Sequence, residues 1–416
     1  MPEGETRMLC QFTFSNYRSF RDETVFSMQA TQMKEFSDSL ITSGDSQSFL
    51  PIAAVYGPNA GGKTNLYRAL EYVCGAVAVP IVALTRDGDH GDGRIGLRRC
   101  SPFAFDDATS KAPSSFELYF RTKGHEYRYE LEVSNEQEIS YEALKRRKVG
   151  GSRSAMLFTR EDDKVSLGPM LRRAKVSTNF NATIPYLSFL AMNSDLDAVQ
   201  DAASWFIRST FLNYNSPYVE FTLERMLDDR RSDEITSLLR SVDIRIDGFR
   251  TETDDEQGGQ KVFVKHKVKG TTYELRLLDE SAGTQKMLCL TGFLLRALRR
   301  GSFIAVDELD AKLHPKLLRF VTLLFKNPEI NKHGAQLFFT SQDVSAMRND
   351  VFRRDEIWFA AKDEGESSQL WSLADIHESN GNLVSKNAAF DRQYLAGRYG
   401  ADPYLTRMEE WVLAHE

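Results

Sequence analysis

The pattern of hydrophobic and polar positions predicts strands and helices, and it is clearest around one glycine-rich loop. Residues 51–56 read Pro-Ile-Ala-Ala-Val-Tyr and are apolar without interruption, which predicts a buried strand. A polar loop follows, and apolar residues then recur at helical spacing, namely Leu66, Ala69, Leu70 and Val73. The order of strand, glycine loop and helix is typical of an α/β fold.

Alternating runs on both sides of this segment predict more strands. Residues 8–14 alternate apolar and polar side chains, as a half-buried strand does. F-E-L-Y-F and Y-R-Y-E-L-E-V flank Lys123-Gly124, and this arrangement predicts a hairpin over residues 116–133. Further short strands are expected at 26–30, 139–144 and 155–159.

The pattern becomes helical after Met170. Amphipathic stretches occupy residues 198–212 and 221–239, and an acidic turn then leads to an alternating run at 261–268. Beyond Leu277 the order is again strand, helix, strand. We therefore expect an α/β core, made of residues 1–168 and 251–416, which a helical insertion at 169–250 interrupts.

Composition limits the classes of protein to which the chain can belong. The 416 residues are 41% hydrophobic and 27% charged, as in an ordinary globular protein, and the formal net charge is −6. No run of about 18 apolar residues predicts a membrane span, and no apolar signal core follows the start of the chain. The expected location is the cytoplasm. Four widely spaced cysteines are expected to be buried thiols rather than disulfides or zinc ligands.

The loop after the buried strand has the residues of a phosphate-binding loop. Gly57, Gly62, Lys63 and Thr64 fill the fixed positions of G-x-x-x-x-G-K-[ST]. Glycines let backbone N–H groups approach phosphate oxygens, while Lys63 reaches the β- and γ-phosphates and Thr64 offers its hydroxyl to Mg²⁺. The alternative, a plain glycine-rich turn, fits the flanking strand and helix less well. The expected nucleotide contacts are Gly57, Pro58, Asn59, Ala60, Gly61, Gly62, Lys63, Thr64 and Asn65.

A second apolar run, residues 302–306, ends in two adjacent carboxylates. An ATPase needs one carboxylate to hold Mg²⁺ through its water shell and another to orient and deprotonate the attacking water. We expect Asp307 to serve the metal and Glu308 to act as the catalytic base, with Lys63 assisting. The alternative interpretation is a solvated acidic pair at the end of a strand. The presence of the phosphate loop favours the catalytic interpretation.

Ser281-Ala282-Gly283 comes just before an amphipathic helix and forms a second anion-binding device. It combines a hydroxyl, free N–H groups and the positive end of a helix dipole. Because one nucleotide needs only one cradle per chain, we expect Ser281 and Gly283 of one protomer to close on the γ-phosphate that Lys63 of another protomer holds. An ordinary helix cap is the alternative.

Two more polar residues are candidates at the edge of the nucleotide pocket. Asp310 follows the carboxylate pair closely, where dimer partners of such ATPases meet. The strand predicted at 336–339 is followed by Thr-Ser-Gln-Asp, and Gln342 there is a candidate sensor of the γ-phosphate. A plain strand-to-helix cap by Ser341 or Asp343 is an equal alternative.

In this order, the motifs resemble those of the ABC-type ATPase heads of the SMC, RecF and OLD class. N-Y-R-S-F at 16–20 is similar to a segment that contacts nucleotide in such heads, so the resemblance implies ATP contacts for Asn16, Arg18 and Ser19. D-E-S-A-G-T-Q at 279–285 resembles the signature motif, and V-D-E-L-D-A-K-L-H-P at 306–315 resembles Walker B with the D-loop.

Two C-terminal segments, 353–359 and 394–403, narrow the resemblance to the RloA and AbiL type of ATPase from bacterial abortive-infection systems. This resemblance implies an ABC-ATPase head, with a P-loop core and an N-terminal antiparallel β subdomain. It also implies ATP and Mg²⁺ as cofactors, a homodimer or higher oligomer that sandwiches ATP, and a separate nuclease or toxin effector in anti-phage defence. The chain has no nuclease motif of its own.

Two positions depart from the family pattern. The switch residue, usually histidine, is Gln342, whose amide can hydrogen-bond a phosphate but carries no proton at neutral pH. Slow turnover is therefore expected. No glutamine lies between Asn65 and Glu136, where the Q-loop is expected, and Ser101-Pro102-Phe103 is the candidate substitute.

Two other functions stay open. A RecF-type repair ATPase would clamp duplex DNA, using basic runs at 94–99, 145–148 and 172–175, although such runs are usually solvated faces. A scaffold that holds ATP almost permanently would sense a phage protein, with hydrolysis incidental. DNA or a phage protein is thus the expected trigger, and no membrane is expected.

Overall fold

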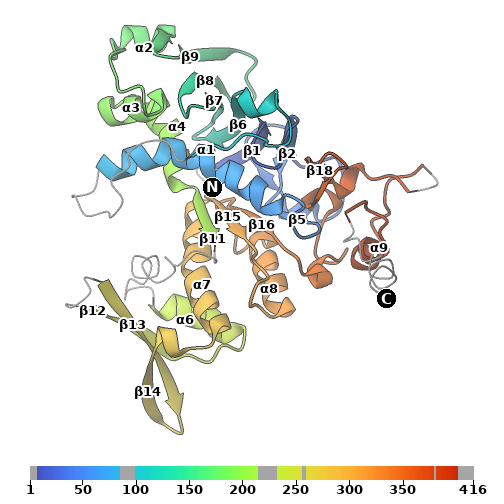
Figure 1. Ribbon diagram of the computed structural model, residues 1–416. Helices are drawn as coiled ribbons and strands as arrows, with labels where there is room; N and C mark the ends of the chain where they lie inside the picture. The colour runs from blue at the N-terminus through green and yellow to red at the C-terminus, as the bar shows by residue number, and fades with distance from the viewer. Residues whose placement is uncertain (1–6, 85–98, 214–231, 255–258, 379–380, 402–416) are drawn as a thin grey trace, which may run out of the picture.

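Two large sheets and the helices between them make up most of the molecule (Figure 1). The computed structural model describes residues 7–84, 99–213, 232–254, 259–378 and 381–401. Within these ranges the predicted α/β class is confirmed, with a P-loop core and an N-terminal antiparallel subdomain. All four cysteines are buried free thiols, as expected.

The first sheet has seven strands, and every neighbouring pair is antiparallel. The predicted hairpin is present, and Lys123 and Gly124 turn the chain with φ of 45° and 72°. In spatial order the strands are β10 (Lys164–Leu167), β9 (Ser154–Glu161), β8 (Ile139–Lys148), β7 (His125–Val133), β6 (Ser114–Thr122), β1 (Met8–Ser15) and β2 (Thr24–Ser27).

The second sheet has six strands, of which the first five are mutually parallel. In spatial order they are β11 (Thr210–Asn213), β15 (Phe303–Asp307), β16 (Gln336–Thr340), β5 (Ile52–Tyr56), β17 (Ile357–Lys362) and the antiparallel β18 (Ser368–Ser372). Because parallel strands end at one edge, the residues that follow β5, β15, β16 and β11 are gathered there.

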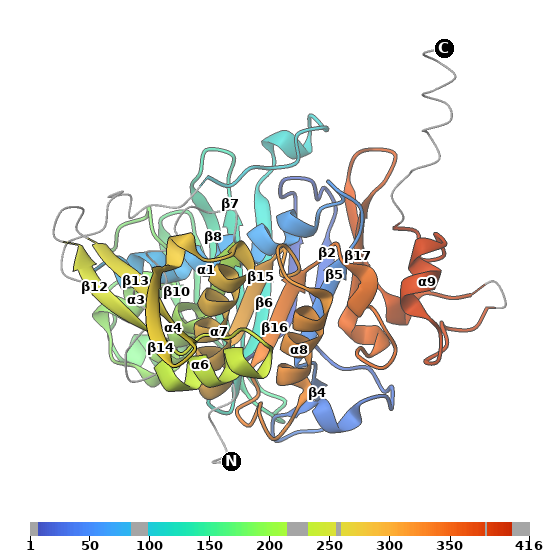
Figure 2. The same ribbon diagram turned by 90° about the horizontal axis from the view of Figure 1, so that it is seen from below.

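The central strands of the six-stranded sheet, β15, β16 and β5, are buried on both faces, which explains the uninterrupted apolar runs in the sequence. Along β5, Ala53 and Val55 join the hydrophobic core shared with the first sheet, while Ile52, Ala54 and Tyr56 join the other core. Helices α1 (Lys63–Leu84), α3 (Tyr186–Asn193) and α4 (Asp197–Arg208) fill the first core. Helices α7 (Ala282–Arg300) and α8 (Pro315–Lys326) cover the opposite face (Figure 2).

Helix α1 is long and apolar enough over Lys63–Ala83 to cross a membrane, with a mean hydropathy of 1.4. This similarity to a membrane-spanning helix rests on length and composition alone. In the structure 61% of its most apolar window is buried inside the protein, and the helix packs against α3, α4, β15 and β16. We therefore describe α1 as a core helix.

Residues 169–250 are not purely helical. They contain α2 (Pro169–Arg173), α3, α4 and α6 (Ser232–Ser241), but also β11, which pairs with β15 in the core sheet. The helix predicted at 198–212 ends at Arg208, because the chain then extends along β15. The stretch predicted at 221–239 lies partly outside the described residues. The division into domains stays a prediction.

A smaller sheet projects beside α6 and α7 (Figure 1). It consists of β12 (Gly248–Asp254), β13 (Gly259–Val268) and β14 (Thr271–Arg276), and β13 confirms the strand predicted at 261–268. In the described part of the chain, the remaining elements are β3 (Ile41–Thr42), β4 (Ser48–Phe49), α9 (Phe390–Leu395) and 3₁₀ turns at Ser37–Ser39, Thr109–Lys111, Leu277–Asp279, Val344–Ala346, Arg354–Glu356 and Leu373–Asp375.

Candidate nucleotide-binding site

The glycine loop lies between β5 and α1 and has almost no room for side chains. Gly57 and Gly62 have φ of 144° and 115°, which L-residues with a Cβ rarely adopt. A Cβ on Gly57 would lie 2.0 Å from the Ala360 carbonyl oxygen, and one on Gly62 would lie 2.4 Å from Ser368 Oγ. Strands β17 and β18 thus hold the loop closely, and only glycine fits these two positions.

Lys63 opens α1 and bends back over the loop. Its buried Nζ donates hydrogen bonds to the carbonyl oxygens of Gly57, at 2.7 Å, and Pro58, at 2.9 Å. Burial lowers the pKa of Lys63, and the carboxylates of Asp310, Glu308 and Asp307 oppose this shift. A polyphosphate at this loop would favour the charged ammonium further.

Asp307 is at the centre of a group of polar side chains that the fold brings together. Its Oδ1 accepts hydrogen bonds from Thr64 Oγ1 at 3.2 Å and Thr340 Oγ1 at 2.7 Å, and its Oδ2 accepts one from Asn213 Nδ2 at 3.3 Å. Burial raises the pKa of Asp307, and the bonds from Thr340 and Thr64 oppose that change. The site therefore joins the ends of β15, β16 and β11 to the start of α1.

The donor set around Asp307 fits Mg²⁺. In the part of the chain that the structure describes, no group of three or more His, Cys, Asp or Glu side chains could hold a metal ion. Mg²⁺ does not require such a cage, because it usually keeps several waters and binds one or two carboxylates plus substrate phosphates. Thr64 and Asp307, in contact beside the glycine loop, supply that kind of partial site.

Glu308 begins a loop with an unusual backbone. Its φ of 53° lies in the left-handed region, and its N–H donates to Thr340 Oγ1 at 2.7 Å. The chain therefore leaves the alternation of the strand immediately after Asp307. Glu308 and Asp307 both act electrostatically on Lys63, so the two carboxylates share one neighbourhood.

Ser281 caps the N-terminus of α7 and is exposed. Its Oγ accepts a hydrogen bond from Thr284 N at 3.1 Å and shares another with Thr284 Oγ1 at 2.8 Å. These bonds are those of an ordinary helix cap, so the geometry fits the cap and leaves the predicted nucleotide contact as a prediction. Gly283 is in the same turn, and a Cβ there would lie 3.2 Å from the Lys312 carbonyl oxygen.

Asp310 connects the loop after β15 to the end of β16. Its Oδ2 accepts hydrogen bonds from the backbone N–H groups of Gln342, at 3.0 Å, and Asp343, at 2.9 Å. Its Oδ1 is buried and accepts no hydrogen bond from the described residues. Gln342 itself is exposed, and Asp343 caps the following 3₁₀ turn, so the cap alternative is realised and the role of Gln342 stays a prediction.

The three residues expected from N-Y-R-S-F differ in their surroundings. Ser19 Oγ accepts hydrogen bonds from Asn65 Nδ2 and Ser368 Oγ, each at 2.8 Å, beside the glycine loop. Arg18 lies over the ring of Tyr17, with 5.6 Å to the ring centroid.

Asn16 does not face the loop that would hold the nucleotide. Its Nδ2 donates to the carbonyl oxygens of Thr109 and Ala112, and its Oδ1 accepts from Phe103 N. Its amide thus holds the segment before β6, and the expected nucleotide contact stays a prediction.

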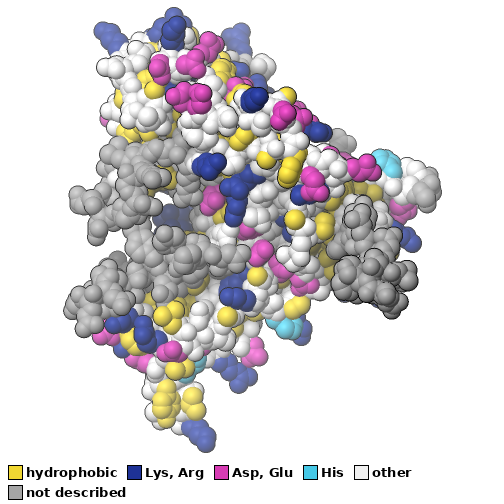
Figure 3. Space-filling model, viewed as in Figure 1, with side chains coloured by type: hydrophobic (Ala, Val, Ile, Leu, Met, Phe, Trp, Pro, Cys, Tyr) yellow, Lys and Arg dark blue, Asp and Glu magenta, His cyan; other side chains and the backbone are white. Residues whose placement is uncertain are grey.

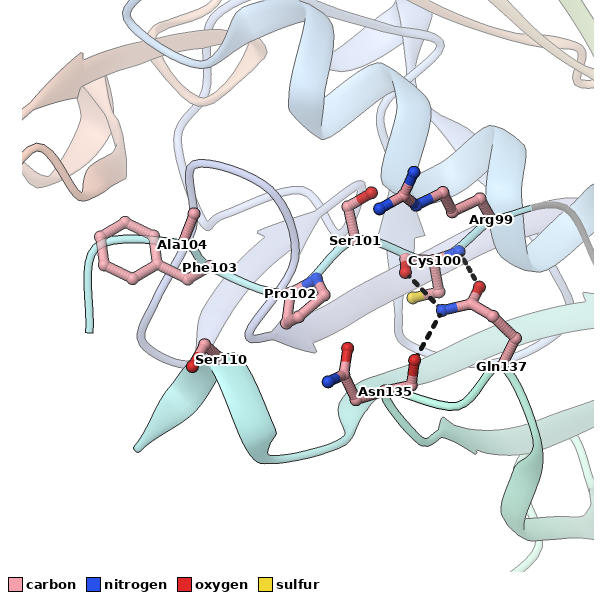
Figure 4. Close-up of a pocket in the computed structure, with 9 residues that line it drawn as sticks. All are labelled: Arg99, Cys100, Ser101, Pro102, Phe103, Ala104, Ser110, Asn135 and Gln137. Carbon is pink, nitrogen blue, oxygen red and sulfur yellow. Dashed lines mark hydrogen bonds between the residues drawn. The ribbon is translucent and has the colours of Figure 1, made fainter. Parts of the chain in front are cut away.

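The candidate substitute for the Q-loop, Ser101–Phe103, lines a cavity of about 630 Å³, and its role stays a prediction (Figure 4). Gln137 holds this segment, because its Oε1 accepts from Cys100 N at 2.5 Å and its Nε2 donates to Cys100 O at 2.8 Å. The amide that reaches Asp307 is that of Asn213, at the end of β11. Asn213 was not predicted from the sequence. The one feature that could have indicated it is an amide residue at the end of a short apolar run.

Solved structures and one protein family are similar to this chain. Among solved structures, the SMC head domain from Thermotoga maritima is 13% identical, with a TM-score of 0.40, and the match covers 88% of this chain and 98% of that chain. An Smc head domain bound to the C-terminal domain of ScpA, derived from Pyrococcus furiosus, is 12% identical, with a TM-score of 0.42, and the match covers 88% and 96%. A comparison with curated proteins found no match.

The family comparison covers most of the chain, including the glycine loop, the signature segment and the carboxylate pair. It matches residues 52–348 to the family described as "AAA domain, putative AbiEii toxin, Type IV TA system". The class of ATPase expected from the order of the motifs is thereby confirmed. The chain belongs to this family of AAA domains.

Proposed function

We propose that the chain is a Mg²⁺-dependent ATPase whose two protomers sandwich ATP. One observation supports this most strongly. The fold brings Thr64, which follows the glycine loop, to within 3.2 Å of Asp307, 243 residues later in the chain. A phosphate cradle and a metal carboxylate that meet at one edge of a parallel sheet are the parts that ATP hydrolysis requires.

Each residue has a role in this proposal. The N–H groups of the glycine loop and the ammonium of Lys63 bind the polyphosphate, while Thr64 and Asp307 hold Mg²⁺. When bound, Mg²⁺ neutralises charge on the phosphate oxygens. Glu308 orients the attacking water and takes its proton, and Asn213 fixes the second oxygen of Asp307.

The proposed dimer gains support from two groups that one protomer leaves available. Ser281 is exposed at the positive end of α7, where an anion is favoured. Asp310 Oδ1 accepts no hydrogen bond from the described residues, although it is buried close to the glycine loop. A second protomer that closes over the loop would bring its own Ser281 to the γ-phosphate, and a donor could reach Asp310 Oδ1 only if closure also opened the surroundings of this oxygen.

Ser281→Arg tests the dimer. The longer side chain would fill the space between the protomers, so we expect ATP-driven association to disappear and turnover to fall by about 10- to 100-fold. Binding of a fluorescent ATP analogue to the single protomer should persist. Light scattering with and without ATP measures association, and Ser37→Arg, at an exposed serine elsewhere, is the control. Unchanged association and turnover in Ser281→Arg would refute the composite site.

Asn213→Ala tests the metal side of the site. Without the amide, the orientation of Asp307 is less fixed, and we expect the Mg²⁺ concentration for half-maximal turnover to rise by about 10-fold. ATP binding in the absence of metal should not change. Magnesium titrations of ATP hydrolysis provide the measurement, with Asn179→Ala, at an exposed asparagine, as the matched control. An identical magnesium dependence would exclude Asn213 from the site.

We further propose that the ATP state of the dimer controls a separate nuclease or toxin effector in anti-phage defence, in the cytoplasm. The description of the family, which names a toxin of a type IV toxin–antitoxin system, supports a role in such a system and leaves the separate effector to be tested. The neighbouring gene discriminates between functions, because a nuclease-like reading frame would favour defence and its absence would favour repair.

Steady-state and single-turnover assays distinguish this ATPase from a scaffold that holds ATP permanently.

The DNA-clamp alternative has weaker support. On β8, Lys145 pairs with Glu130 and Arg147 pairs with Glu126, so part of this basic run is neutralised within the sheet. On the face shown in Figure 3, basic and acidic side chains are interspersed. Arg94 and Arg98 lie outside the described residues. Duplex DNA binding that weakens steeply with salt would revive this alternative.

A further inference from the structure

A buried lysine joins the signature helix to the loop that begins with Glu308. Lys286 is in the second turn of α7 and is 3% exposed. Its Nζ donates hydrogen bonds to the carbonyl oxygens of Glu308 at 2.9 Å, Leu309 at 2.9 Å and Ala311 at 2.7 Å. An ammonium has three protons, and these three acceptors match them.

The loop that Lys286 holds has a backbone that needs support. Its first and last residues, Glu308 and Lys312, have φ of 53° and 62°, a region that non-glycine residues seldom adopt. The three carbonyl groups that Lys286 binds belong to Glu308, Leu309 and Ala311, within this loop. Gly283, one turn earlier on α7, approaches the far end of the loop at Lys312. The start of α7 therefore contacts the loop at both ends.

The other side of the loop is attached to the metal side of the site. Leu309 N donates to the Thr340 carbonyl oxygen at 3.0 Å, and Glu308 N donates to Thr340 Oγ1, which in turn donates to Asp307. A continuous series of contacts thus leads from Ser281, through the first turns of α7 and Lys286, to Glu308. Because protein interiors are densely packed, such a series of contacts is a route by which a movement at one end could reach the other.

We propose that Lys286 is a positioning residue that couples the two nucleotides of the dimer. This inference rests on the proposed function, in which Ser281 contacts the nucleotide held by the partner while Glu308 acts on the nucleotide held by its own chain. Occupancy of the partner's site moves the first turn of α7, Lys286 carries this movement to the loop, and the loop sets the position of Glu308. Each ATP then promotes hydrolysis of the other.

Lys286→Met tests the coupling, since it keeps the aliphatic stem and removes the ammonium. Wild-type protein is expected to hydrolyse ATP with positive cooperativity in ATP concentration. In Lys286→Met we expect kcat to fall by about 10- to 100-fold and the cooperativity to disappear, while the affinity for a fluorescent ATP analogue changes less than about twofold. Hydrogen exchange at the amides of residues 308–313 should become faster in the ATP-bound variant.

Lys326→Met is the matched control. Lys326 is a buried lysine on α8, and its Nζ donates to the Val351 carbonyl oxygen at 2.7 Å and to Glu356 at 2.6 Å, outside the contacts of the site. This variant should lose thermal stability but keep kcat per folded molecule and the cooperativity. If it reproduces the defect of Lys286→Met at an equal folded fraction, the coupling role is refuted.

Two further outcomes separate this inference from the proposed function. If wild-type protein does not hydrolyse ATP, the proposed function fails. Unchanged hydrogen exchange at residues 308–313 in Lys286→Met would refute the positioning role, whether or not ATP is hydrolysed. If hydrolysis occurs but Lys286→Met keeps its kcat and its dependence on ATP, the coupling fails alone. If Lys286→Met does not fold, Lys286→Arg replaces it. The planar guanidinium keeps the charge but cannot donate to the three carbonyl oxygens from one point, so the same loss of kcat and cooperativity is expected.

Discussion

Glu308→Gln is expected to lower the steady-state rate of ATP hydrolysis by about 100- to 1,000-fold, with ATP binding retained. The amide has nearly the shape of the carboxylate but cannot take a proton from water. The backbone of Glu308 is held by Thr340 and Lys286 through main-chain groups, so the substitution should leave the loop in place. In the proposed cycle hydrolysis separates the protomers, so ATP should trap Glu308→Gln as a dimer, which size-exclusion chromatography with light scattering measures.

A neutral substitution elsewhere provides the comparison for this result. Glu329 is exposed, and Glu329→Gln removes one negative charge without touching the glycine loop or its partners. It should hydrolyse ATP at the wild-type rate and dissociate after turnover. Undiminished hydrolysis in Glu308→Gln would show that another group activates the water.

Gly57→Ala is the second variant with a large expected effect. The added Cβ would lie 2.0 Å from the Ala360 carbonyl oxygen, at a φ of 144° that alanine rarely adopts. Because the obstacle is backbone of β17, the loop must move, and we expect a loss of about 2–5 kcal/mol in the free energy of unfolding. ATP binding should be lost, since the N–H groups of the loop would no longer converge on the phosphates.

Gly75→Ala on α1 is the matched control, because nothing lies within 4 Å of the position that its added methyl group would take. A glycine to alanine change inside a helix should stabilise the protein by about 0.5–1 kcal/mol. Thermal unfolding and binding of a fluorescent ATP analogue measure both variants. An unaltered melting temperature and affinity in Gly57→Ala would contradict the close approach of β17.

The parts of the site that lie close together in sequence are the parts that the sequence predicts. Strand β5, the glycine loop and α1 are continuous, and the apolar run that ends at Asp307 is equally local. The α/β class follows from these runs, because strands buried on both faces are uninterrupted in hydrophobicity. The contact between Thr64 and Asp307 could be anticipated only from the rule that parallel strands end at one edge.

Asn213 and Asn16 show why other parts could not be predicted. Asn213 reaches Asp307 because β11 pairs with β15, 94 residues further along the chain, and four half-buried residues give no periodicity that would reveal such pairing. Asn16 occupies a position that the motif associates with nucleotide, yet its amide is taken by backbone groups 93–97 residues away. In both cases tertiary pairing, rather than local pattern, decides what the side chain contacts.

The strands that carry the site differ in their support. Strand β5, which leads into the glycine loop, is enclosed by β16 and β17, and β15, which ends at Asp307, is enclosed by β11 and β16. Strand β11, which carries Asn213, pairs with β15 alone among the described strands. Amides of enclosed strands open only with the whole molecule, while a short strand at a border opens locally at much lower free energy. Warming should therefore release the Asn213 amide from Asp307 well before it disturbs the glycine loop or Asp307 itself, so the proposed ATPase would need more magnesium for the same rate while it still holds its nucleotide.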